Sequence, residues 1–182
     1  MFLKKHSEPT KSVCIIFFGG EPLLNIDVLK ETTIYAKKIL KDRVEFGITT
    51  NALNLTDDII SFLKEYNIVP LFSLDGGEKE TNLLRKSYDS GVNVFKTAIA
   101  NLKKYIKITG IRPNVRATLT KINNNKEKIA RSLYNEGFYN VTISTCSPYK
   151  NNNDGISLTH QDIKKYKKHH ENYVRYINNK LA

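Results

Sequence analysis

The sequence predicts an α/β fold built from parallel βα units, on two observations. Short apolar runs of strand length alternate along the chain with longer runs that have helical spacing. The run at 112–120 alternates polar with apolar residues, and the run at 44–51 also has one polar face. A strand buried on both faces would be apolar throughout. The polar faces therefore favour a partial barrel with an open lumen over a closed, packed one.

Five apolar runs are expected to form the strands. They are Val13–Phe18, Val44–Thr50, Ile68–Leu74, Pro113–Leu119 and Val141–Thr145. Each is followed by a turn signal such as Gly-Gly or Asp-Gly-Gly, or by the start of a helical pattern. The third is followed by a long irregular stretch that extends to Gly91.

Capping signals and apolar spacing place the helices. The first helix is capped by Asn25 or Asp27 and carries an apolar stripe. The second helix is capped by Thr56. The stripe consists of Ile26, Leu29, Ile34 and Ile39. Further helices are expected near Val94–Tyr105 and over Lys126–Asn135, the latter ended by Gly137. Thr159 and Asp162 have the spacing of a capping box for the last helix.

Composition indicates one folded domain over residues 1–182, in which 1–12 end a preceding element and 159–182 form a C-terminal helix. A hydrophobic fraction of 40%, with ten Tyr and eight Phe, is enough for a core and excludes wholesale disorder. No apolar run approaches the roughly 20 residues of a membrane helix, and no signal peptide is evident. Two cysteines cannot form a disulfide framework, so we expect a cytoplasmic protein without a membrane partner.

The net charge of +11 is local. Residues 101–131 carry nine basic groups and one acidic group, and 160–182 carry six and two. Lysine outnumbers arginine by 23 to 6, whereas recognition of bases and phosphates favours arginine. We therefore favour a solvated lysine surface over a nucleic-acid interface, which stays the alternative.

Polar residues follow the expected strands at their carboxyl ends, where parallel βα folds bind ligands. The set comprises Gly19, Gly20 and Glu21; Thr50 and Asn51; Ser73 and Asp75; Arg116, Thr118 and Thr120; and Ser144, Thr145 and Cys146. Two consecutive glycines free the backbone to approach a ligand closely, and Glu21 adds a carboxylate. An ordinary Gly-Gly turn, with Glu21 near a helix N-terminus, explains the same residues equally well.

Ser73 and Asp75 lie on one face of a strand end and form a fork that suits vicinal hydroxyls, such as those of a ribose. The alternative is that this Asp-Gly-Gly segment is simply a turn. The stretch 76–91 is long for a connection, which is typical of functional loops. It carries Arg85, which is either a clamp for a carboxylate or an exposed side chain.

The histidines and cysteines show no metal-ligand spacing. Cys14 lies in the middle of a strand and is expected in the core. Cys146 lies at a strand end, but a single thiol makes no metal cluster.

Four motifs at successive strand ends resemble those of radical S-adenosylmethionine (SAM) enzymes. They are Phe17–Asn25, which contains Gly-Gly-Glu-Pro, then Ile48–Asn51, Ser73–Gly76 and Arg116–Thr120. Together they look like the SPASM-type branch, which includes sulfatase-maturing and peptide-maturing enzymes. The resemblance implies a partial (β/α)6 TIM-like barrel of the radical SAM type, with its first βα unit missing. It further implies SAM bound at a [4Fe-4S] cluster, and a 5′-deoxyadenosyl radical that modifies a peptide or protein.

The resemblance also assigns residues to SAM by their place in the motifs. They are Gly19, Gly20, Glu21, Asn51, Ser73, Asp75, Arg85 and Arg116. The Gly-Gly-Glu segment would hold the methionine amino group, and Ser73 with Asp75 would contact the ribose. Arg85 or Arg116 would meet the SAM carboxylate, and Asn51 would line the cavity. No catalytic residue is assigned.

The departures from the family are equally specific. The family holds its cluster with CxxxCxxC before the Gly-Gly-Glu segment, and no such motif exists here. One explanation is a core piece of a radical SAM enzyme, with cluster cysteines upstream of Met1; we favour it. The other is a degenerate, non-catalytic module that binds SAM or a peptide. The resemblance implies a peptide or protein substrate and an electron donor such as flavodoxin or ferredoxin.

Overall fold

The computed structural model describes residues 5, 7, 8, 11–87, 91–146, 156–158 and 160–181. The chain divides into two compact units. Unit 1 consists of Met1–Phe72 and Ala100–Pro113, and unit 2 consists of Ser73–Ile99 and Asn114–Ala182. The chain passes between the units three times: at the end of strand β3, within helix α5 (Val94–Thr109), and between Pro113 and Asn114.

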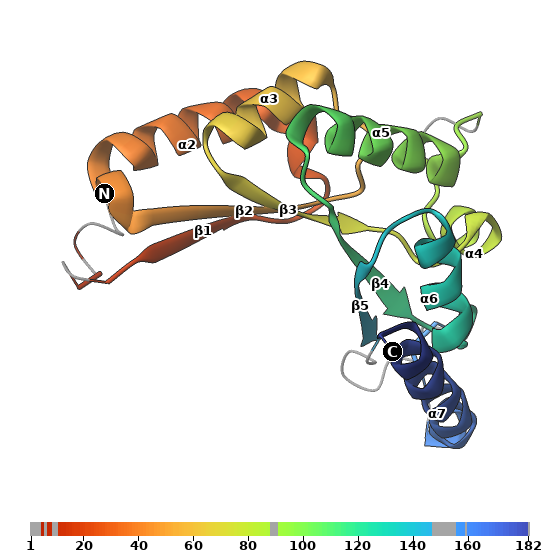
Figure 1. The fold of residues 1–182 in the computed structure, drawn as a ribbon. Coiled ribbons are helices and arrows are strands. Elements are labelled where there is room, and N and C mark those ends of the chain that lie inside the picture. Colours follow the sequence, from red (N-terminus) through yellow and green to blue (C-terminus); the bar gives the residue numbers. More distant parts are fainter. Residues whose placement is uncertain are drawn as a thin grey trace. The chain divides into compact units, whose positions relative to one another are not determined.

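Unit 1 contains three parallel strands in the order β1, β2, β3. They are β1 (Val13–Phe17), β2 (Val44–Thr50) and β3 (Ile68–Ser73). In register, Val13 lies opposite Val44, and Phe46 lies opposite Ile68. Helix α2 (Ile26–Leu40) follows β1, and α3 (Asp57–Glu65) follows β2, and both lie on the same side of the strands (Figure 1). The predicted strand–helix alternation is confirmed here.

The helices of unit 1 begin at side-chain caps. The Asn25 carboxamide oxygen accepts a hydrogen bond from the Val28 N–H at 3.4 Å, and Thr56 accepts one from Ile59 at 3.3 Å. Each cap satisfies one of the donors that a helix leaves free in its first turn. The predicted stripe of α2 is wrong in part, because Ile34 is half exposed. The buried positions are Leu29, Thr33, Ala36 and Leu40, whose spacing of four, three and four residues keeps them on one face.

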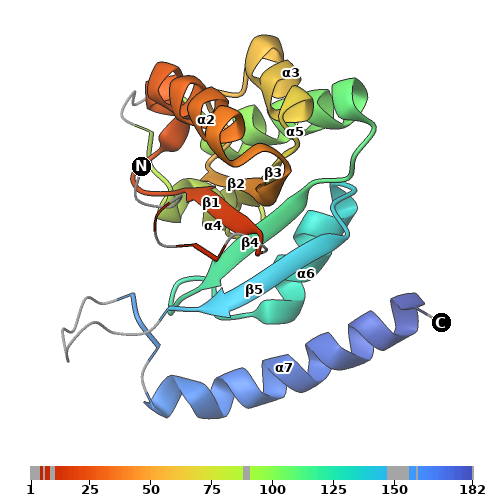
Figure 2. The same cartoon turned by 90° about the vertical axis from the view of Figure 1, so that its left-hand side faces the viewer.

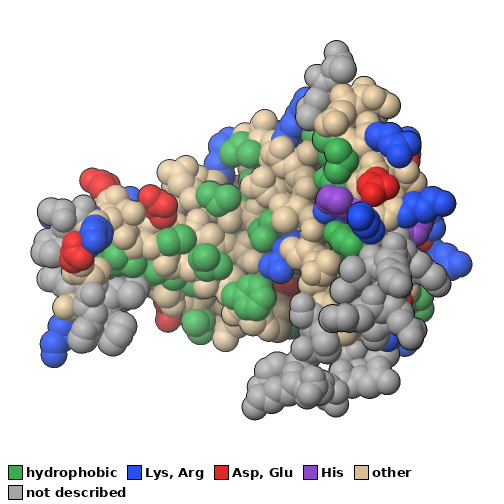
Figure 3. Space-filling view, turned by 90° about the horizontal axis from the view of Figure 1, so that it is seen from below, with side chains coloured by type: hydrophobic (Ala, Val, Ile, Leu, Met, Phe, Trp, Pro, Cys, Tyr) green, Lys and Arg blue, Asp and Glu red, His purple; other side chains and the backbone are tan. Residues whose placement is uncertain are grey.

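The opposite face of the three strands carries no helix of unit 1. Ile16 and Val69 are 63% and 60% exposed on it, and Figure 3 shows hydrophobic side chains gathered on this open face. Cys14 lies on the same face and is exposed, so the prediction that it belongs to the core is wrong. An apolar strand is buried on both faces only where both faces are covered, and in unit 1 the helices cover one.

Unit 2 contains two parallel strands, β4 (Asn114–Leu119) and β5 (Asn140–Thr145), with Asn114 opposite Asn140. The predicted two-faced pattern of β4 is confirmed, since Val115, Ala117 and Leu119 are buried and Arg116 is exposed. Helix α6 (Lys126–Asn135) connects the two strands.

Helix α6 ends as predicted at Gly137, which has a φ of +91°. The Gly137 N–H donates to the Tyr134 carbonyl, and the Phe138 N–H donates to the Leu133 carbonyl. These two bonds form the glycine-dependent helix ending that needs a left-handed residue.

Two further helices complete unit 2. The long helix α7 (His160–Leu181) packs against α6, with the Arg131 guanidinium 3.9 Å from the centre of the Tyr176 ring (Figure 2). The predicted irregular stretch before Gly91 contains helix α4 (Glu78–Leu84), so that prediction is wrong. The proposed cap Thr159 lies outside the described residues.

Among the helices that the structure describes, none is long and apolar enough to cross a membrane.

Candidate functional site

The turn after β1 depends on two glycines. Gly19 and Gly20 have φ angles of +110° and +23°, which side chains rarely adopt, and a Cβ at either would meet nothing within 4 Å. The backbone is therefore open to a ligand at this point. Glu21 follows at the end of this turn, where its side chain caps the short 3₁₀ turn Pro22–Asn25.

The Glu21 carboxylate joins the end of β1 to the end of β2. Its Oε1 accepts hydrogen bonds from the Leu23 N–H at 3.1 Å and the Thr50 hydroxyl at 2.7 Å. Its Oε2 accepts one from the Asn51 N–H at 2.7 Å. A carboxylate has about four acceptor positions, so one position on Oε2 stays available. No described cation pairs with Glu21, which leaves its charge uncompensated within the described residues.

The loop after β2 is held from two sides. The Asn51 side-chain oxygen accepts from the Leu53 N–H at 2.9 Å, and the Ala52 N–H donates to the Thr50 hydroxyl at 3.1 Å. The Asn101 side chain donates to the carbonyls of Ala52 and Leu53 at 2.8 and 3.1 Å. Sequence patterns do not reveal Asn101, because its role depends on α5 packing beside this loop.

A hollow of about 570 Å³ lies on the open face of unit 1. Its lining includes Cys14, Ile16, Gly47, Val69 and Leu71, and it is mainly apolar. Gly47 lies on this lining, where a Cβ would make an ordinary contact 3.6 Å from the Ile16 side chain. Small-molecule sites have volumes in this range.

Unit 2 holds the other predicted ligands. Ser73 and Asp75 are buried, with exposures of 9% and 3%. Asp75 Oδ1 accepts hydrogen bonds from the Thr118 N–H at 2.8 Å and from Arg85 Nη2 at 3.2 Å. Arg85 Nε lies 2.6 Å from Asp75 Oδ2, an ion-pair contact in which the N–H does not point at the oxygen. The structure thus pairs two predicted SAM ligands with each other.

Arg116 has different surroundings. Its side chain is exposed on the polar face of β4, and its guanidinium has no ion-pair partner among the described residues. Its backbone carbonyl accepts a hydrogen bond from the Leu74 N–H at 3.0 Å. In a parallel pair of strands, this bond places Ser73 alongside Arg116.

Asn123 is a buried site residue that the sequence did not reveal. Its side-chain nitrogen donates to the carbonyls of Asp75 and Thr118, both at 2.9 Å. Its side-chain oxygen accepts from the N–H and hydroxyl of Thr120, both at 2.7 Å. Asn123 therefore connects the loop after β4 to the segment after β3. It stands in a run of three asparagines, and nothing in the sequence distinguishes it from its neighbours.

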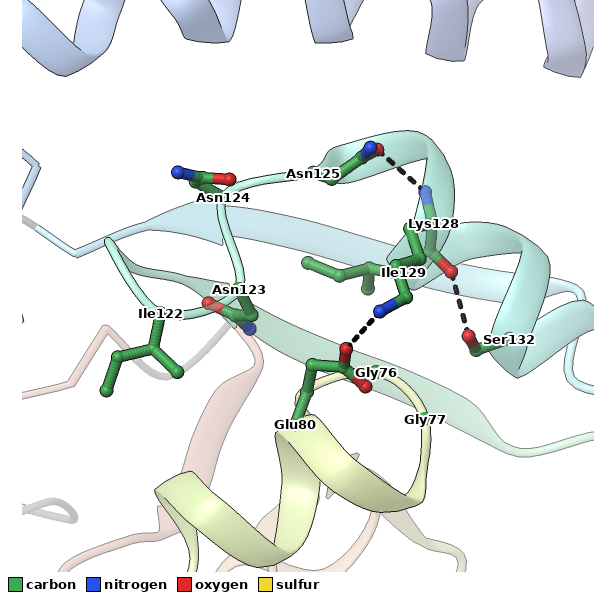
Figure 4. Close-up of a pocket in the computed structure, with 10 residues that line it drawn as sticks. All are labelled: Gly76, Gly77, Glu80, Ile122, Asn123, Asn124, Asn125, Lys128, Ile129 and Ser132. Carbon is green, nitrogen blue, oxygen red and sulfur yellow. Dashed lines mark hydrogen bonds and ion pairs between the residues drawn. The ribbon is translucent and has the colours of Figure 1, made fainter.

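A second cavity of about 130 Å³ lies in unit 2 beside α4 and α6 (Figure 4). The Lys128 ammonium crosses it to the Glu80 carboxylate. The hydrogen bond from Lys128 is the main reason that the pKa of Glu80 is lowered from its ordinary value. None of the predicted SAM ligands lines this cavity. Its two charged side chains, Lys128 and Glu80, already form an ion pair with each other.

A [4Fe-4S] cluster does not fit the residues of this chain. Such a cluster needs several thiolates on one site, whereas the sequence has only Cys14 and Cys146. Cys14 lies on β1 in unit 1, and Cys146 follows β5 in unit 2, where its sulfur lies 3.6 Å from the Ser157 hydroxyl. Among the described residues, no three His, Cys, Asp or Glu side chains form a group that could hold a metal ion.

Comparison with known sequences gives one family. Residues 3–116 match the model of the radical SAM superfamily. The radical SAM cyclopropyl synthase TigE of Paramaledivibacter caminithermalis is 30% identical over 87 residues. That match covers 48% of this chain and 18% of TigE.

Comparison with solved structures shows the fold. Native anSMEcpe with bound AdoMet (SAM) gives a TM-score of 0.80 at 18% identity, covering 96% of this chain and 48% of that one. Native anSMEcpe with bound AdoMet and Cp18Cys peptide also gives 0.80, covering 97% and 51%. A domain of the pyruvate-formate lyase-activating enzyme from Bacteroides vulgatus gives 0.57 at 14% identity, covering 87% and 93%. The predicted α/β fold of the partial-barrel type is thereby confirmed, and the chain spans about half the length of anSMEcpe.

Proposed function

This chain belongs to the radical SAM superfamily, and from that premise we propose that it is the SAM-binding core of an enzyme that modifies a peptide or protein. The observation that carries the proposal is the Glu21 carboxylate at the end of β1. It is held in place by three donors, keeps an acceptor position, and adjoins two glycines that leave the backbone open.

The methionine part of SAM fits these groups chemically. An ammonium group is a compact cation with three donors, and Glu21 offers it an uncompensated charge and a free position on Oε2. Gly19 and Gly20 allow the close approach, and Asn51 lines the same end of the strands. Because Glu21 is already fixed by Thr50 and Asn51, it does not have to be ordered when SAM binds.

The motifs of unit 2 carry the residues proposed for the ribose and the carboxylate. The Ser73 hydroxyl is assigned to the ribose, and Arg116 is the better of the two arginines for the carboxylate. Its guanidinium is exposed and carries an uncompensated charge, whereas Arg85 is paired with Asp75. An arginine binds a carboxylate through two parallel hydrogen bonds, which fixes orientation as well as affinity.

The radical chemistry of the family belongs to a [4Fe-4S] cluster, and the residues of this chain do not fit one. We therefore assign no cluster ligand and no catalytic step to residues 1–182. The same disagreement supports the second candidate function, a non-catalytic module that binds SAM or a peptide.

The substrate class and the electron donor are proposed by likeness. The solved structures of anSMEcpe include complexes with peptides, and the hollow of unit 1 has an apolar lining. Both favour a peptide or protein substrate. A flavodoxin or ferredoxin would serve as electron donor.

Calorimetric titration with SAM tests the proposal. The wild-type chain should bind SAM, and Glu21→Gln should weaken binding at least about tenfold, since it removes the charge that faces the ammonium. Glu31→Gln, which neutralises an exposed carboxylate on α2 of the same unit, is the control and should bind as the wild type does. Failure of the wild-type chain to bind SAM would contradict the proposal.

Production of 5′-deoxyadenosine tests whether residues 1–182 carry the radical chemistry by themselves. After anaerobic reconstitution with iron and sulfide, a catalytic core with its own cluster would form 5′-deoxyadenosine from SAM under reducing conditions. The presence of only two cysteines predicts that residues 1–182 bind SAM without forming this product. The binding-module candidate predicts the same.

A further inference from the structure

We propose that Asp75 and Arg85 are a positioning pair that orients Ser73 and Arg116 for SAM, and that neither contacts SAM itself. This inference rests on the proposed function and concerns unit 2 alone. Its starting point is that the Asp75 side chain is almost completely buried and lies against the Arg85 guanidinium. Burial of a carboxylate is tolerated where it is both paired and hydrogen-bonded.

Asp75 lies close to both proposed ligands along the chain: it follows Ser73 by two residues and is hydrogen-bonded to β4, which carries Arg116. Leu74 separates Ser73 from Asp75, and its N–H donates to the Arg116 carbonyl at 3.0 Å. Two residues further along β4, the Thr118 N–H donates to the Asp75 carboxylate at 2.8 Å. These two bonds join the segment that follows Ser73 to β4, one at Arg116 itself and one two residues beyond it.

The backbone of Asp75 is fixed as well. The Asn123 side chain donates to the carbonyls of both Asp75 and Thr118 at 2.9 Å. Asp75 is therefore held through its carboxylate by Arg85 and Thr118, and through its carbonyl by Asn123. A group held this firmly stays in place when a ligand binds, which suits a support better than an adaptable contact.

Charge decides between the two arginines. The positive charge of Arg85 is compensated by Asp75 at 2.6 Å, so its attraction for a second carboxylate is weak. Among the described residues, no carboxylate pairs with Arg116. Arg116 thus takes the SAM carboxylate, and Arg85 acts on it only through Asp75 and the strand ends.

Binding of SAM and of decarboxylated SAM, measured side by side by calorimetry, distinguishes support from contact. Both ligands keep the ribose that Ser73 contacts, so Asp75→Asn and Arg85→Gln should each weaken both ligands, by about tenfold for decarboxylated SAM and by at least as much for SAM, which also loses the Arg116 contact. The double variant should lose no more than either single one, because the two residues act as a unit. Arg116→Gln should weaken SAM and leave decarboxylated SAM nearly unchanged, since the latter has no carboxylate to lose.

Two controls keep the result interpretable. Glu127→Gln breaks the exposed ion pair with Arg131 in the same unit and should change neither affinity. Arg85→Lys keeps a positive charge beside Asp75, so it should remain folded and show a smaller loss for both ligands, even if Asp75→Asn unfolds. Circular dichroism on each variant separates loss of fold from loss of binding.

Each outcome has one meaning. A loss at Arg85 that is confined to SAM would show that the pair does not position Ser73, and it would overturn the inference. Unchanged affinity in Arg85→Gln, with the wild type binding SAM, would overturn it as well and leave the proposed function intact. Absence of SAM binding by the wild-type chain would overturn the proposed function, and the positioning role would fall with it.

Discussion

Glu21 in unit 1 and Asp75 in unit 2 occupy equivalent places, since each is a carboxylate that follows a parallel strand and accepts a backbone N–H from the end of the next strand. They differ in what neutralises them. Asp75 is 3% exposed and lies against Arg85, whereas Glu21 is partly exposed and faces no described cation. Asp75 therefore stabilises the fold and has its charge compensated by Arg85, whereas Glu21 keeps a negative charge that a ligand can neutralise.

The largest expected effect concerns the stability of unit 2. Asp75→Ala would leave the Arg85 charge and the Thr118 N–H without their buried partner, which typically costs about 3–5 kcal/mol. Urea unfolding followed by circular dichroism measures this. A loss below about 1 kcal/mol would show that the pair is not the buried support described here.

Glu21→Ala should destabilise less and affect binding more. It removes three hydrogen bonds from a partly exposed carboxylate, which we expect to cost about 1–3 kcal/mol. SAM binding should fall below detection, because the charge facing the ammonium is lost. A variant that binds SAM as the wild type does would break the comparison between the two carboxylates.

Arg116→Ala should change binding without changing stability. Its exposed guanidinium makes no ion pair among the described residues, so the unfolding free energy should shift by less than about 0.5 kcal/mol. Loss of a charge-assisted pair with the SAM carboxylate should lower affinity about tenfold. Calorimetry and urea unfolding of the same preparation test both parts, and a large loss of stability would assign Arg116 to the fold instead.

The smallest effect is a pH dependence in unit 2 that does not involve the site. Because Lys128 lowers the pKa of Glu80, their interaction stabilises the fold above the ordinary glutamate pKa of 4.5 and is lost as the pH falls through the lowered pKa. Lys128 is largely exposed, so the contribution is under about 1 kcal/mol. The melting temperatures of the wild type and Glu80→Gln should therefore differ at pH 7, and this difference should disappear in acid. A difference in melting temperature that does not change with pH would contradict the prediction.

The order of the strands and most helices could be predicted because periodicity and caps are local properties. Each predicted strand lies within one residue of the observed one, and Thr56 caps α3 as expected. Helix α4 was missed because its only buried residue is Thr81, so it has no apolar stripe to detect. Cys14 was misplaced because an apolar strand does not reveal which of its faces is covered.

The candidate site could be predicted as a set of residues but not as a set of contacts. The prediction from strand-end positions is confirmed for Glu21 and Ser73, which lie at or just after the ends of β1 and β3, whereas Arg116 lies within β4, three residues before its end. The pairing of Asp75 with Arg85 joins residues on either side of α4, and that helix was not predicted. Asn123 acts through two backbone carbonyls that only the folded chain brings together.

The most direct test is an amide NMR titration of the ¹⁵N-labelled chain with SAM. The account predicts shifts at the amides of Gly19, Gly20, Glu21 and Asn51 and at those of Ser73 and Arg116, with α7 unaffected. Shifts confined to the cavity between Glu80 and Lys128, or no shifts at all with the fold intact, would contradict the claim that this chain binds SAM at its strand ends.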